Sequence, residues 1–152
     1  MPSYQSGSLT HTNSLEPFDR YIDVYGLRIA ALPTMGGQEA VSDTFLRQVA
    51  HTAKQLLQRD AEGINKEVQD QAVQAMESTN VLQIVVSNGF PSYSPSLEDN
   101  SDLDNIRGKY DNIDVIGELV SQKGEVDFGD SQTTEVIEHL LHTYTHFLLP
   151  SA

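Results

Sequence analysis

Apolar positions follow a strand-like pattern in three stretches of the chain. Residues 21–32 are rich in β-branched and aromatic side chains and end before a proline, as strands often do. Residues 81–87 form an apolar run that is too short for a typical helix and favours a strand. A weaker run over residues 113–120 favours a strand over a short helix. The pattern therefore predicts two strong strands and one weaker one.

Three other stretches repeat their apolar positions every three or four residues, which is the helical period. The first begins after Ser42, a good N-cap, and ends near Arg59. The second covers residues 66–78 with Asn65 as its cap, and the third covers residues 133–149. Strands and helices in this order predict an α+β fold, a small mixed sheet with packed helices. A helical crossover would let the two strong strands pair in parallel.

Residues 1–17 are rich in serine, threonine and asparagine, and we expect a flexible N-terminal arm there. Residues 18–152 are expected to form a single α+β domain. Within it, residues 88–110 are dense in proline, serine, asparagine and aspartate. This composition predicts a long loop, and loops of that length in compact domains usually bind something or are disordered.

The chain has 152 residues and a net charge of −13, from 22 acidic and nine basic residues. Such a charge repels nucleic acid and anionic membranes but attracts cations or a basic peptide or protein partner. Because there is no cysteine, thiolate metal sites, disulfides and a cysteine nucleophile are excluded. The first 14 residues have neither the basic nor the apolar region of a signal peptide, and no stretch is apolar enough to span a membrane. We therefore expect a soluble protein, of a compartment that the sequence does not specify.

The C-terminal helix predicted over residues 133–149 has two unlike sides. At about 100° per residue, its glutamates and histidines fall within an arc of roughly 100°. These residues are Glu135, Glu138, His139, His142 and His146. The opposite side is apolar: Val136, Ile137, Leu140, Leu141, Tyr144, Phe147 and Leu148. Three of the five histidines of the chain thus gather on one helix face.

Histidines four residues apart lie one turn apart, and two such imidazoles can bind one tetrahedral zinc ion. His142 and His146 have this spacing, and His139 can pair with His142 instead. Glu138, one turn before His142, is a candidate ligand or base. One straight helix rarely supplies three ligands to one ion, so we expect a third ligand from elsewhere. His51 is a candidate third nitrogen, although its place near the apolar side of its helix favours a partly buried structural histidine.

The segment from Glu138 to Phe147 resembles the active-site helix of the zincin metallopeptidases, whose pattern is His-Glu-x-x-His. His142 and His146 match the two zinc ligands of that pattern. The resemblance covers one helix of about 15 residues. It implies a zincin-like α+β fold, a zinc cofactor and a divergent metallopeptidase.

The sequence departs from the zincin pattern at Thr143, which occupies the position of the catalytic glutamate. A threonine cannot take a proton from zinc-bound water at neutral pH. No third-ligand motif follows His146, so either a third ligand lies upstream or the site is not a standard zincin site. Glu138 is the candidate catalytic carboxylate; the other acids near the helix are Asp127, Asp130 and Glu135.

Two other functions fit the same pattern. In the first, the chain is a non-catalytic acidic structural or protein-interaction module, and its histidine face is solvent-exposed or a homo-oligomer contact. In the second, the clustered histidines make a pH-responsive assembly module, because they charge near pH 6 to 7, where imidazole titrates.

Overall fold

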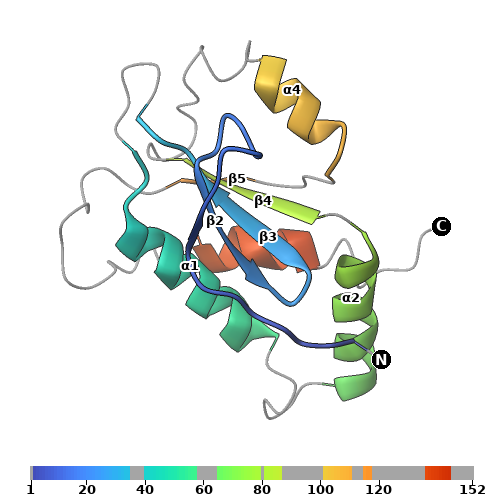
Figure 1. Ribbon diagram of the computed structural model, residues 1–152. Helices are drawn as coiled ribbons and strands as arrows, with labels where there is room; N and C mark the ends of the chain where they lie inside the picture. The colour runs from blue at the N-terminus through green and yellow to red at the C-terminus, as the bar shows by residue number, and fades with distance from the viewer. Residues whose placement is uncertain are drawn as a thin grey trace.

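The computed structural model describes residues 2–34, 40–57, 65–79, 81–86, 101–110, 115–117 and 136–144. Strands and helices follow one another along the chain as shown in Figure 1. They are β1 (Thr10–His11), β2 (Arg20–Val24), β3 (Leu27–Ala31), α1 (Asp43–Leu56), α2 (Lys66–Ser78), β4 (Val81–Val86), α4 (Ser101–Arg107) and β5 (Val115–Gly117). Residues 136–144 are also helical and are drawn in orange-red. The predicted α+β class is confirmed.

The five strands form one mixed sheet in the order β1-β2-β3-β4-β5. β1, β2 and β3 are antiparallel neighbours, whereas β3–β4 and β4–β5 are parallel. The parallel pairing of β3 with β4 confirms the crossover predicted between the two strong strands. The crossover contains α1 and α2. The sheet is thus antiparallel at the β1 edge and parallel at the β5 edge.

The prediction of one strand over residues 21–32 is wrong, because this stretch is a hairpin. The chain reverses at Tyr25 and Gly26, whose φ angles are 52° and 89°. Two successive residues with positive φ form the tight turns that suit the twist of a two-stranded hairpin. Met76 and Glu77 of α2 lie so close to Gly26 that a Cβ there would come within 2.5 Å of the Glu77 nitrogen. Glycine is therefore required both by the turn and by the packing.

The two helix starts predicted from capping residues are confirmed. The Ser42 side chain accepts a hydrogen bond from the Phe45 nitrogen, and Asn65 accepts from the nitrogens of Glu67 and Val68. Each cap gives a partner to backbone donors that the helix itself leaves unpaired. The predicted end of the first helix near Arg59 is three residues beyond the observed end of α1, and Arg59 lies outside the described residues.

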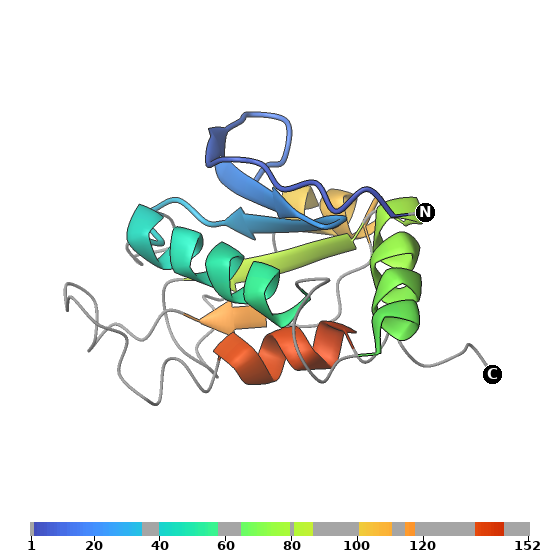
Figure 2. The ribbon, with the colours of Figure 1, turned by 90° about the horizontal axis from the view of Figure 1, so that it is seen from below.

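Two clusters of buried side chains cover the two faces of the sheet. On one face, α1, α2 and the helix over 136–144 pack against Ile22, Ile29 and Val85. On the other face, Ile106 of α4 packs against residues that include Leu82 and Ile84. Figures 1 and 2 show α4 on the side of the sheet opposite α1. Since β4 is covered on both faces, all six of its residues are buried, as its apolar run requires.

Residues 2–17, expected to be a flexible arm, follow the edge of the sheet. The Gly7 nitrogen donates to the Asp23 oxygen at 2.8 Å, and the Thr12 nitrogen donates to the Asp19 oxygen at 2.9 Å. Before them, the Ser3 nitrogen donates to both carboxylate oxygens of Glu77. The arm thus adds hydrogen bonds along β2 and connects this edge to α2.

The loop predicted over residues 88–110 contains a helix. α4 occupies Ser101–Arg107, while residues 88–100 lie outside the described part. Ile106 is buried against the sheet, which explains why an otherwise polar segment folds back onto it. Farther along the chain, β5 lies within the run predicted as the weaker strand. Among the described residues, no helix is both long and apolar enough to cross a membrane.

Candidate metal-binding face and polar pocket

The helix over 136–144 is held against the sheet and α1 by its apolar side. Val136, Leu140 and Tyr144 are buried in the larger core cluster. The Tyr144 hydroxyl donates to the Ala53 backbone oxygen of α1 at 3.0 Å, and burial raises the pKa of this phenol far above its ordinary value. The packing therefore fixes the rotation of the helix about its axis.

Thr143, the residue in the position of the zincin glutamate, points into the protein. Thr143 is only 1% exposed. Its hydroxyl group donates a hydrogen bond to Oε1 of Gln83 over a distance of 3.0 Å. Gln83 is fully buried in the middle of β4. The same hydroxyl lies 3.3 Å from the His139 backbone oxygen. This position faces the sheet, so a carboxylate there would be buried among core residues instead of reaching solvent.

The predicted charged face is directed away from the core over the residues that are described. Glu138 and His142 are exposed, and His139 is half-buried at the border of the face. Leu141 does not follow the prediction: it was placed on the apolar side but is 46% exposed. Thr143 is instead buried beside Val136, Leu140 and Tyr144. An exposed leucine therefore lies next to the histidines on the open side of the helix.

His139 and His142 lie side by side on this face. Their ring centroids are 5.8 Å apart and the ring planes are nearly perpendicular, at 88°. A zinc ion lies about 2.0–2.1 Å from each imidazole nitrogen, which places the centroids of two rings on one ion roughly 5 to 6 Å apart. The observed separation lies within this range, in a T-shaped contact between the two rings. These two imidazoles would supply two of the four ligands of a tetrahedral zinc ion.

The remaining predicted ligands are not brought to this pair by the described structure. His146, Glu135, Asp127 and Asp130 lie outside the described residues. Over the ranges that the structure describes, no three histidine, aspartate or glutamate side chains are grouped closely enough to hold a metal ion. His51, the candidate third nitrogen, was expected to be partly buried but is exposed, and it lines a groove between α1 and the N-terminal segment.

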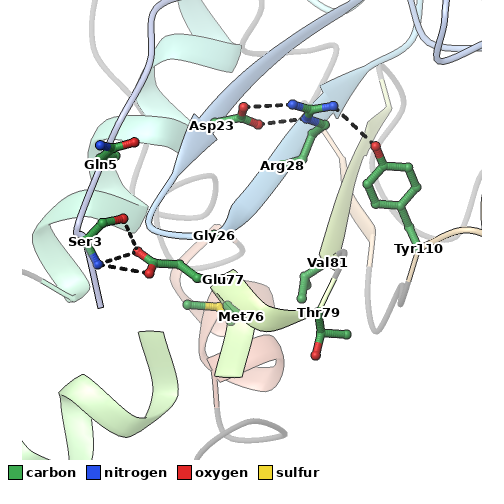
Figure 3. A pocket seen from close by; sticks show the side chains of 10 residues that line it. All are labelled: Ser3, Gln5, Asp23, Gly26, Arg28, Met76, Glu77, Thr79, Val81 and Tyr110. Atoms are coloured by element: carbon green, nitrogen blue, oxygen red, sulfur yellow. Dashed lines mark hydrogen bonds and ion pairs between the residues drawn. The ribbon is translucent and has the colours of Figure 1, made fainter. Parts of the chain in front are cut away.

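A second candidate site, which sequence reasoning missed, is a polar pocket of about 480 Å³. Figure 3 shows it between the N-terminal segment, the β2–β3 hairpin, the end of α2 and Tyr110. Arg28 donates to both carboxylate oxygens of Asp23 at 2.8 and 2.9 Å, and to the Tyr110 hydroxyl at 3.2 Å. The hydrogen bonds to Asp23 raise the pKa of Arg28 above its ordinary value, against the effect of partial burial.

The charged groups of this pocket have partners within the protein, Asp23 for Arg28 and Ser3 for Glu77. Arg28 also lies over the Tyr21 ring, 4.1 Å from its centroid, and the Glu77 carboxylate accepts three hydrogen bonds from Ser3. Such internally satisfied groups stabilise the hairpin and hold the N-terminal segment on α2. The signal in the sequence was the pair Asp23 and Arg28, which lie opposite each other across the turn. The pocket is therefore better explained as a structural polar contact than as a reactive site.

Comparison with known proteins adds no relative to this description. No family model, no curated protein and no solved structure matches the chain.

Proposed function

We propose that the chain is a zinc-binding, zincin-like domain whose metal site lies on the C-terminal histidine face. The observation that supports it best is the orientation of the helix over 136–144. Its buried stripe turns His142 and Glu138 outward, next to His139, at a ring separation that suits a shared ion. His142 is central to the proposal, because it can pair with His146 at i+4 or with His139 at i−3.

Zinc bound at this face would polarise a carbonyl group and make bound water more acidic. Thr143 points inward and has no carboxylate, so it cannot act on bound water. Glu138 is the carboxylate that the described part of the helix carries on its exposed side. In a divergent metallopeptidase, Glu138 would accept the proton of the attacking water, a role that requires a solvent-accessible carboxylate. Metal binding is the primary proposal, and peptide hydrolysis depends on it.

The test of metal binding is the zinc content of protein purified without a histidine tag, measured by elemental mass spectrometry. We expect one zinc per chain, and loss of it in His142→Ala. His146→Ala and His139→Ala then identify the second ligand, since only the partner of His142 should be needed. A metal-free chain that takes up no zinc at micromolar concentration would overturn the proposal.

Two matched controls use the histidines outside this face. His11→Ala removes an exposed imidazole from β1 and should leave zinc uptake unchanged. His51→Ala removes the candidate third nitrogen, and we expect no loss, because His51 lines a separate groove. Glu138→Gln should retain zinc but abolish any cleavage of a fluorogenic peptide library, which separates binding from catalysis.

A second candidate function is a protein-interaction module, and the exposure of Leu141 favours it. A leucine that is 46% exposed between Glu138 and His142 gives this face an apolar contact point. Exposed apolar side chains with polar neighbours are typical of interaction sites only when they form a patch, so this candidate ranks second. Concentration-dependent self-association by sedimentation, lost in Leu141→Ser without loss of fold, would favour it over the metal site.

A further inference from the structure

A groove beside α1 is lined by basic side chains, although the protein as a whole is acidic. It runs between α1 and residues 6–9 of the N-terminal segment and has a volume of about 340 Å³. Ile22 and Val24 of β2 contribute apolar side chains to it. Its basic lining residues are Arg47, His51 and Lys54, and none of the described residues that line it is an aspartate or a glutamate. In a chain with a net charge of −13, this is a local concentration of positive charge.

The basic side chains of the groove are available to a ligand. Arg47, His51 and Lys54 are all exposed, and none of them makes an ion pair with another described residue, although the charge of Arg47 also acts on the nearby carboxylate of Asp43. By contrast, Arg20 and Arg28 are each bound to a neighbouring aspartate. The groove therefore differs from the pocket of Figure 3, in which Arg28 is paired with Asp23 and Glu77 accepts hydrogen bonds from Ser3.

The spacing of the basic residues suits an extended peptide. Along α1, Arg47 and Lys54 are separated by about 10.5 Å at 1.5 Å per residue, with His51 between them. In an extended chain, side chains on one face repeat about every 6.7 Å, so two or three alternate residues span this row. Acidic residues at alternate positions would follow the basic row, and the residues between them would face the opposite wall of the groove, where the apolar side chain of Leu9 is partly exposed.

We propose that this groove binds an extended acidic peptide segment of a partner protein, with aspartate or glutamate alternating with small apolar residues. Charge complementarity favours this occupant, because attraction between the basic row and carboxylates acts within the Debye length. A nucleic acid is disfavoured, since its long charged backbone would meet the acidic remainder of the surface. The inference is independent of the proposed zinc site.

The test is fluorescence anisotropy with a labelled eight-residue peptide that alternates glutamate and valine. We expect saturable binding that weakens as salt is added, because the contacts are charged. A peptide with lysine in place of glutamate should not bind. A peptide with serine in place of valine should bind more weakly, since it loses the contact with the apolar residues of the groove.

The variant Arg47→Gln/Lys54→Gln should bind the glutamate–valine peptide about tenfold more weakly, as expected for the loss of two charged contacts. Its matched control is Lys66→Gln/Lys109→Gln, which removes the same charge from exposed positions elsewhere and should bind as the wild type does. Ser8→Phe, at an exposed lining residue, should block the groove without removing a charge. Circular dichroism checks that each variant is folded.

Three results would overturn the proposal: absence of binding to the glutamate–valine peptide, equal weakening in the groove variant and its matched control, or unchanged binding in a folded Ser8→Phe protein. Preference for a labelled single-stranded DNA of equal charge would also overturn it in favour of a general polyanion site.

Discussion

The Thr143 hydroxyl lies 3.0 Å from Oε1 of Gln83, and this hydrogen bond is buried between the C-terminal helix and the middle of the sheet. It joins residues that are 60 positions apart in the sequence. Together with the buried side chains of Val136, Leu140 and Tyr144, it fixes which side of the helix faces the core, so that Glu138 and His142 face away from it.

Thr143→Val should lower the free energy of unfolding by about 1 to 2 kcal/mol, because it removes the donor of a buried hydrogen bond at nearly constant volume. Chemical denaturation measures the change. Thr52→Val is a matched control, since its hydroxyl only donates to the Gln48 backbone oxygen within α1. An equal loss in both variants would contradict a special role for the contact with Gln83.

Thr143→Glu, which recreates the zincin pattern in sequence, should destabilise the protein without creating a hydrolase. The new carboxylate would enter a site only 1% exposed, and burying a charge without a cationic partner costs about 3 kcal/mol or more. Thermal denaturation and peptide-cleavage assays test the two parts. A stable variant with new, zinc-dependent activity would show that position 143 reaches the solvent face.

Gly26→Ala should lower the free energy of unfolding by about 2 to 4 kcal/mol, from the positive φ and the contact with the α2 backbone together. The new Cβ would lie 2.5 Å from the Glu77 nitrogen. Gly7→Ala is the control, because its Cβ would meet only ordinary contacts at 4.0 Å. If both alanine variants lower the free energy of unfolding in urea by the same amount, the hairpin does not approach α2 as closely as described.

Asp43→Asn should reduce stability at neutral pH and have a smaller effect in acid. The hydrogen bond from Arg20 holds the pKa of Asp43 below its ordinary value of 3.8, so the charged carboxylate stabilises the fold above that pH. This stabilisation is lost as the pH falls through the lowered pKa of the folded state. Because the Asp43 side chain is 46% exposed, solvent screening limits the effect to less than about 1 kcal/mol.

Denaturation curves of wild type and Asp43→Asn at pH 7 and at successively lower pH measure this difference. The two proteins should converge in stability only when the pH lies below the lowered pKa of Asp43 in the folded state, where the carboxyl group is protonated in both the folded and the unfolded state. A difference that stays constant over this range would mean that Asp43 acts through its shape and not through its charge.

Local sequence signals determined much of the fold. Ser42 and Asn65 determined where α1 and α2 begin, because capping depends on the few backbone amides that follow the cap. The apolar run of β4 predicted a strand, and the structure shows that this strand is covered on both faces. The hairpin at Tyr25 and Gly26 was missed, because the residues on both sides have the same apolar, strand-like pattern and a lone glycine is a weak turn signal.

The C-terminal helix shows the limit of the same reasoning. The helical period predicted that Val136, Leu140 and Tyr144 lie on one side of the helix, and Glu138 and His142 on the other. The structure buries the first three residues and exposes the other two. The sequence placed Leu141 on the wrong side, because the hydrophobicity of a residue does not specify the edges of a buried stripe. Those edges depend on which surface the helix packs against, here Gln83 of β4 and Ala53 of α1.

The sequence by itself determined the α+β class, the helix starts and the gathering of histidines on one helix, since these depend on neighbours within one or two turns of the chain. Only the tertiary structure decided that Thr143 is buried, that Asp23 and Arg28 neutralise each other in a pocket, and that Arg47, His51 and Lys54 border a groove with residues 6–9. These relations join segments far apart in the sequence, and their geometry depends on packing across the sheet, which no local pattern specifies.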